Sequence, residues 1–261
     1  MLSFGELLRM FIGILANTLL QVLRNPEKME DPYKIFRVLI KFMDEQYVDS
    51  FLNDGLLYMN NIDYFRKYED ADVALRGDAH EGLAASYKAE ELTINLGEHL
   101  VTGAVGKVDL RYNHEGDTNI YSMTKISDGK IIEAGDAGLF LSKKFKEFGN
   151  RAVVISGSNI TEFEKRLKMA ISADINIHTP REDNVVAKQV KYSSRDDHHG
   201  QMNVFDKFDN YAWQHEWRIA FKQKIASGAY PLRIGSLSDI AQVFETELLI
   251  SESLKLVPTN L

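Results

Sequence analysis

The stretch WQHEWRIAF, residues 213–221, contains both tryptophans of the chain, yet Gln, His, Glu and Arg stand among its apolar residues. Side chains alternate between two faces along a β-strand. On a strand over residues 214–221, the largely apolar face consists of His215, Trp217, Ile219 and Phe221. The other face consists of Gln214, Glu216, Arg218 and Ala220. The first face is expected in a core, whereas the second points either into solvent or into a cleft, and both interpretations stay open.

Strand patterns dominate the rest of the sequence. YKIFRVLIKFM (33–43), NIYSMTKI (119–126) and RAVVISG (151–157) each predict a strand. EQYVDSFLN (45–53) has helical spacing, with Asp44 as its expected cap and Gly55 as its end, and LSDIAQVF (237–244) predicts a last helix or turn. Glycine-rich phosphate-binding motifs are absent from the sequence. The sequence therefore predicts an α+β fold of mainly antiparallel sheets with a few packed helices.

The first residues predict a separate element. Over residues 1–24 the apolar side chains gather on one side of a helix, and Pro26 and Pro32 bracket a charged linker over residues 25–32. The apolar run is too short and too interrupted for a stable membrane span. We expect an amphipathic helix that docks on the domain, on a second copy or on a partner subunit, followed by a single α+β domain over residues 33–261.

Composition narrows the classes of function. The net charge of −7 argues against a broad surface that coats nucleic acid. The chain contains no cysteine, which excludes disulfides, zinc–thiolate sites and thiol nucleophiles. This composition is compatible with a reducing cytoplasm.

A resemblance to known proteins rests on four short motifs, two of which overlap in the stretch 213–221. Gln214-x-Glu216 at the start of a strand resembles the Q/E-x-E element of ADP-ribosyltransferases. RGDAHEG (76–82), YSM (121–123) and QHEWRI (214–219) are similar to motifs in a set of uncharacterised bacterial proteins, many encoded near phage-defence or toxin genes. The similarity extends from about Tyr33 to Ile250. It implies an ADP-ribosyltransferase-like fold, with NAD as substrate and a protein or nucleic acid as the unknown acceptor.

The resemblance also implies roles for individual residues. Glu216 takes the place of the catalytic glutamate, which stabilises positive charge as the bond between nicotinamide and ribose breaks. Gln214 would orient the acceptor. NAD would be bound by Lys41 or Arg37 and by Ser122 and Thr124, with Arg76 and Asp78 in a loop over the site. Two departures weaken this mapping, because Met123 interrupts the expected run of hydroxyl residues and Lys41 stands where many relatives carry His.

Two alternatives remain. The chain could be a non-catalytic sensor or assembly subunit of a defence system, with its N-terminal helix as the contact element. It could also be a metal-dependent nuclease that uses Asp78, Glu81, Asp196 and His198, although no nuclease spacing supports this and adjacent residues rarely chelate one ion well.

Overall fold

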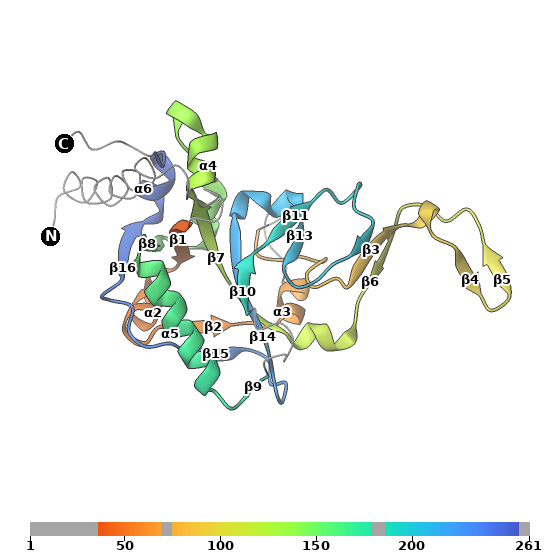
Figure 1. The fold of residues 1–261 in the computed structure, drawn as a ribbon, viewed down its shortest axis with the longest axis horizontal. Coiled ribbons are helices and arrows are strands. Elements are labelled where there is room, and N and C mark those ends of the chain that lie inside the picture. The colour runs from red at the N-terminus through yellow and green to blue at the C-terminus, as the bar shows by residue number, and fades with distance from the viewer. Residues whose placement is uncertain (1–35, 69–74, 179–185, 256–261) are drawn as a thin grey trace, which may run out of the picture. The chain divides into compact units, whose positions relative to one another are not determined.

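The computed structural model describes residues 36–68, 75–178 and 186–255 (Figure 1). The predicted N-terminal helix and linker lie outside these residues. No helix in the described ranges combines the length and apolar character needed to cross a membrane. The chain forms an α+β fold whose strands pair almost entirely in antiparallel fashion, as the sequence predicts.

The described chain divides into two compact units. Unit 1 contains residues 36–55, 123–169 and 234–255, and unit 2 contains residues 56–122 and 170–233 apart from the gaps in description. The chain passes from one unit to the other within strand β7 (Asn119–Ser127) and near the end of helix α5 (Asn159–Ala173).

Unit 1 is built on an antiparallel sheet. Strand β1 (Phe36–Met43) lies between β7 and β8 (Arg151–Ser156), and β16 (Ala241–Glu245) pairs with the other edge of β8. Val38, Leu39 and Ile40 are all buried, so β1 is covered on both faces. The remaining elements are η2 (Glu45–Tyr47), α2 (Val48–Asp54), α4 (Asp128–Glu133), η5 (Gly135–Ala137), η6 (Lys143–Phe148), α5 and α6 (Thr246–Ser251).

The helical segment over residues 45–54 is determined by local sequence at one end and by a distant contact at the other. Gly55 ends α2 in the left-handed conformation, with φ of 59°, and a Cβ there would lie 2.1 Å from the carbonyl oxygen of Gly235. Glycine is therefore required, as the sequence predicts. The predicted cap is wrong, because the Asp44 side chain makes no capping hydrogen bond and the N–H of Glu45 donates instead to Asn150 Oδ1 at 2.9 Å.

The prediction of a helix or turn over residues 237–244 is confirmed for residues 238–240, which form a turn, and is wrong for residues 241–244. Part of LSDIAQVF forms strand β16, and the following TELLIS forms helix α6. Residue Ala241 pairs with Ile155 and Glu245 pairs with Arg151, so the segment completes the ladder of β8. Pairing with a strand distant in the sequence decides this conformation, which local propensity does not reveal.

Unit 2 contains several groups of short paired strands. Strand β14 (Glu216–Gln223) pairs with β10 (Ala187–Gln189) and β9 (Ile177–His178), and β2 (Leu56–Met59) pairs with β15 (Tyr230–Arg233). Strand β3 (Ala85–Lys88) lies between β12 (Gly200–Gln201) and β6 (Lys107–Leu110). The other pairs are the parallel β11 (Lys191–Ser193) with β13 (Asp206–Phe208) and the hairpin of β4 (Ile94–Leu96) with β5 (His99–Val101). The helical elements are α3 (Ile62–Lys67), η3 (Ala89–Glu91), η4 (Asn113–Asp117) and η7 (Asp209–Gln214).

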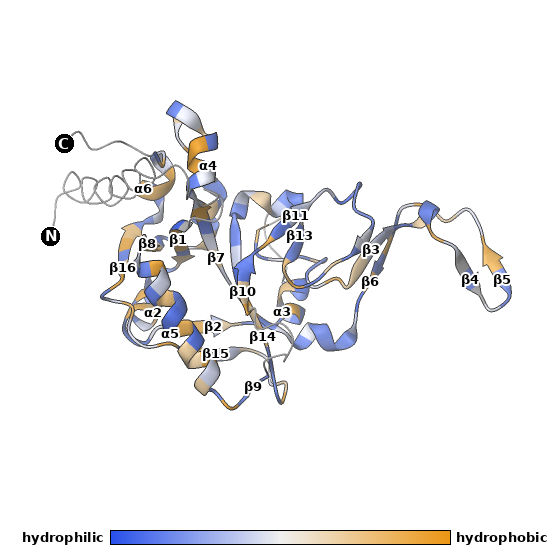
Figure 2. Ribbon diagram, viewed as in Figure 1, coloured by the Kyte–Doolittle hydropathy of each residue, from blue (hydrophilic) through white to orange (hydrophobic). Residues whose placement is uncertain are grey.

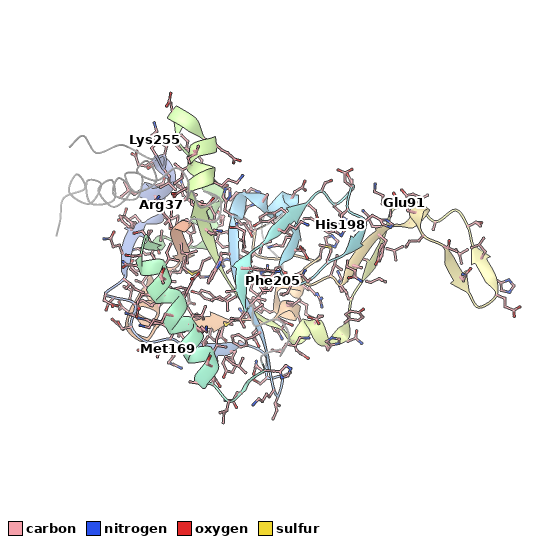
Figure 3. All side chains as sticks on the ribbon, viewed as in Figure 1. Arg37, Glu91, Met169, His198, Phe205 and Lys255 are labelled. Carbon is pink, nitrogen blue, oxygen red and sulfur yellow. The ribbon has the colours of Figure 1, made fainter. Side chains whose placement is uncertain are left out.

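The core of unit 2 lies against β14. Ile62, Ile120, Phe205 and Ala220 form one buried cluster, and Phe205 is labelled in Figure 3. Trp217 and Ile219 on the same strand are also buried. Ala220 and Ile219 are neighbours on opposite faces of the strand, so β14 is covered on both sides.

Candidate functional site

The conformation at the start of β14 differs from the predicted strand. Gln214 is the last residue of η7. His215 then adopts a left-handed conformation with φ of 46°, and the strand begins at Glu216. The solvent interpretation of the polar face is wrong, because Glu216 and Arg218 are 3% and 1% exposed, whereas the predicted burial of Trp217, Ile219 and Phe221 is confirmed. Both faces of the strand are buried, and the polar face is buried among charges.

Glu216 is held through both of its carboxylate oxygens. Ser122 Oγ donates to Oε1, and Arg218 Nε donates to the same oxygen at 2.7 Å. Lys207 Nζ lies 3.3 Å from Oε2. The backbone N–H of Glu216 donates to Tyr192 Oη at 2.9 Å. The side chain is thus fixed by hydroxyl, guanidinium and ammonium donors from three strands.

Arg218 joins Glu216 to the RGDAHEG loop. Its Nη1 donates to Glu81 Oε1 at 2.6 Å and its Nη2 donates to Glu81 Oε2 at 2.9 Å, a bidentate pair. Nη1 also donates to the carbonyl of Val204. The planar guanidinium fits this arrangement, since its donors match two carboxylates and a carbonyl at once.

Lys207 is the second buried cation, and it comes from β13. Its Nζ lies 3.7 Å from Glu81 Oε2 and 3.8 Å from Asp78 Oδ2, in addition to its contact with Glu216. The amine also lies 4.2 Å from the ring centroid of Tyr211. We call Asp78, Glu81, Lys207, Glu216 and Arg218 the ion cluster. Each member is at least nine-tenths buried.

The loop that carries Asp78 and Glu81 is fastened by further hydrogen bonds. Tyr211 Oη donates to the carbonyl of Gly77 at 2.8 Å, and Gln214 Nε2 donates to the carbonyl of Leu75 at 2.8 Å. Asp78 Oδ1 accepts from the N–H of His80 at 2.8 Å. The loop therefore lies against the ion cluster as a fixed part of unit 2.

The cluster contains three carboxylates and two cations, so full ionisation would leave it with a buried net charge of −1. Burial raises the pKa of Asp78 to about 6, and the nearby charge of Glu81 adds to this effect. Burial also opposes ionisation of Glu216, but Arg218 and Lys207 outweigh it and hold the pKa of Glu216 well below its usual range. The pKa of Lys207 is raised, because its three carboxylate neighbours overcome the desolvation of the ammonium. Asp78 thus takes up a proton, and balances the charge of the cluster, as the pH falls through about 6.

The predicted site residues belong to both units. Glu216, Ser122, Gln214 and Asp78 meet at the ion cluster of unit 2, where Gln214 Oε1 lies 3.4 Å from Lys207 Nζ. Arg76 lies half-buried in the same loop as Asp78.

The predicted NAD-binding residues Arg37, Lys41 and Thr124 belong to unit 1. Arg37 (Figure 3) is buried, and its Nε donates to Asp128 Oδ1 at 2.6 Å. Thr124 is buried in β7 opposite Ile40, and Lys41 is half-buried in β1 opposite Val153.

The four residues of the nuclease alternative occupy different environments. Asp78 and Glu81 belong to the ion cluster, whereas Asp196 is exposed and His198 contacts Ser193. Within the described ranges, no three His, Asp or Glu side chains converge on a point where they could hold a metal ion.

Sequence reasoning missed Lys207 and Tyr192. Lys207 lies in the segment FDKFD (205–209), where Phe205 and Phe208 are buried, and a lysine between buried aromatic residues is a signal that could have identified it. A buried lysine requires a charge partner, and Lys207 finds one in Glu216, nine residues away, and two more in the distant RGDAHEG loop.

Chemically, the cluster presents a carboxylate that stays ionised in a nearly dry environment. Such a group stabilises adjacent positive charge more strongly than a carboxylate in water does. Comparison with family models, curated proteins and solved structures finds no match to this chain.

Proposed function

We propose that this protein cleaves the bond between nicotinamide and ribose in NAD, and transfers ADP-ribose to a macromolecular acceptor or to water. In this proposal Glu216 is the carboxylate that stabilises the oxocarbenium-like transition state. The role inside the cell would be that of a bacterial toxin or phage-defence effector in the cytoplasm. This role rests on the resemblance of the sequence motifs.

The contact between Ser122 and Glu216 is the observation that supports the proposal. The resemblance assigned these residues, 94 positions apart, to one site, and Ser122 Oγ donates to Glu216 Oε1. Arg218 and Lys207 keep the Glu216 carboxylate ionised, the state in which it can stabilise a developing cation. Catalysis also requires that NAD reach this carboxylate, whose oxygens now contact protein donors.

The burial of Glu216 favours a second candidate function, a non-catalytic binding or assembly subunit. In that function the ion cluster would serve only to fix the RGDAHEG loop to β13 and β14. Ionic contacts from Glu81 and Asp78 to Arg218 and Lys207 support it, since these contacts account for both cations without any substrate. The two functions differ in whether Glu216 is needed for chemistry beyond its effect on stability.

Nicotinamide release from NAD by the purified protein tests the proposal. We expect wild-type protein to release nicotinamide and Glu216→Gln to lose activity by a factor on the order of 10² or more. Glu115→Gln, at a half-buried carboxylate that pairs with Lys222 in the same unit, is the matched control and should retain activity. Tryptophan fluorescence must show that both variants are folded at the assay temperature.

The acceptor is tested with labelled NAD. Label retained on protein or on added nucleic acid identifies a transferase, and free labelled ADP-ribose alone identifies a hydrolase. Absence of nicotinamide release by the wild type, or equal release by wild type and Glu216→Gln, rejects catalysis at this residue and favours the binding subunit.

A further inference from the structure

A β-hairpin in unit 2 projects beyond the strands that support it. Strands β3 and β6 lead through η3 into β4 and β5, and Figure 1 shows this hairpin at the end of the β3–β6 ribbon. Glu91, labelled in Figure 3, marks its base. We call residues 92–106, which contain β4 and β5, the arm. Within the described ranges, β4 and β5 pair only with each other.

The arm leaves apolar side chains exposed. Leu100 and Val101 in β5 are 59% and 42% exposed, and Val105 is 85% exposed. A Cβ placed on Gly97, Gly103 or Gly106 would meet no atom within 4 Å. An isolated two-stranded hairpin is marginally stable in water, and exposed apolar edge strands are sites of strand addition. The arm therefore has the properties of an element that is completed by a partner.

The low charge of the arm fits a second copy of the chain as its partner. Charged residues make up 26% of the chain, but among the 15 residues of the arm Glu98 is the only Asp, Glu, Lys or Arg. Two copies of a chain with net charge −7 repel each other, and the repulsion is weakest where charged groups are sparse. The arm is thus a part of unit 2 at which two like-charged copies can meet at small electrostatic cost.

The geometry of β5 suits pairing with itself. The turn residues Gly97 and Glu98 join the facing residues Leu96 and His99, and Gly97 has φ of 63°. In such a hairpin the facing pair next to the turn is hydrogen-bonded, so the N–H and C=O of Leu100 point to the outer edge. A two-fold axis beside Leu100 would place β5 of a second copy antiparallel to it, with the two Leu100 residues opposite each other.

We propose that the arm is a dimerisation element, in which the outer edge of β5 pairs with β5 of a second copy to form a four-stranded sheet. Figure 2 shows the apolar character of β5 that this sheet would cover. The proposal is independent of the catalytic proposal for Glu216.

Charge-swapped variants of the full chain test this interface. We expect wild-type protein to have a mass near twice 29.7 kDa in sedimentation experiments at micromolar concentration. Leu100→Lys and Leu100→Glu each place like charges opposite each other, and should weaken dimerisation at least tenfold. An equimolar mixture of the two variants should restore the dimer as a heterodimer. Ile225→Lys, at an apolar side chain 84% exposed outside the arm, is the control and should leave dimerisation unchanged.

A cross-link locates the contact directly. Because the chain has no cysteine, Leu100→Cys introduces a unique thiol, and facing residues of a hydrogen-bonded antiparallel pair lie about 5.5 Å apart between Cα atoms, within disulfide range. We expect a covalent dimer under oxidising conditions. A wild-type monomer at 100 µM would overturn the proposal. A dimer that persists in both charged variants would also overturn it. This includes a dimer that is lost only when residues 1–24 are deleted, because its contact would then lie in that segment.

Discussion

Replacing Asp78 with asparagine should change the pH dependence of stability. The pKa of Asp78 rises from 3.8 to about 6 because the carboxyl is buried beside Glu81. The folded chain therefore binds this proton more tightly than the unfolded chain does. The stabilisation is complete below about pH 3.8 and is lost as the pH rises through 6. A difference of about two pKa units corresponds to about 3 kcal/mol, of which about 2.5 kcal/mol is lost between pH 4 and pH 8.

The amide side chain of the Asp78→Asn variant would stay neutral at every pH, and its oxygen could still accept from the His80 N–H. The free energy of unfolding of Asp78→Asn, relative to wild type, should increase by about 2.5 kcal/mol from pH 4 to pH 8. Urea unfolding followed by tryptophan fluorescence measures it, since Trp213 and Trp217 are the two tryptophans and both belong to unit 2. Asp196→Asn controls for the loss of one exposed carboxylate. If the free energy of unfolding varies with pH in the same way in wild type and Asp78→Asn, the assignment of the proton to Asp78 is refuted.

Two further predictions concern the stability of unit 2, measured by the same fluorescence assay. Arg218→Met leaves two buried carboxylates without their main donor and should cost about 3–5 kcal/mol, whereas Lys222→Met on the same strand removes a partly exposed pair and should cost about 0–1 kcal/mol. Equal losses of stability in the two variants would contradict the conclusion that Arg218 stabilises unit 2 more than Lys222 does. Tyr192→Phe removes the acceptor of the Glu216 N–H and should cost about 1–3 kcal/mol, and an unchanged midpoint would show that this hydrogen bond is dispensable.

Local patterns predicted much of the fold. The apolar strands β1, β7 and β8 and the end of α2 at Gly55 follow from side-chain alternation and from the one residue type that fits the turn. Elements whose conformation depends on a distant partner were missed. Strand β16 is the main example, because its ladder with β8 decides its conformation.

The candidate site was predictable only in part. Glu216 and Arg218 were noticed because charged residues interrupt an apolar stretch, but alternation alone could not decide whether they face solvent or a buried partner. The partner of Arg218 is Glu81, which is 137 residues away. Lys207 completes the cluster from a third segment. Such a network depends on tertiary packing, which determines both the burial of the charges and the shifts of their pKa values.

The most direct test of catalysis at Glu216 compares two serine variants. Ser122 Oγ donates to Glu216, and Ser86 Oγ donates to Asp109 Oδ1 at 2.7 Å in the same unit, so Ser122→Ala and Ser86→Ala each remove a hydroxyl–carboxylate hydrogen bond. If Glu216 is catalytic, Ser122→Ala should lower kcat for nicotinamide release at least ~10-fold, whereas Ser86→Ala should retain the wild-type rate. Equal rates in the two variants, or no nicotinamide release by the wild type, would contradict the proposal.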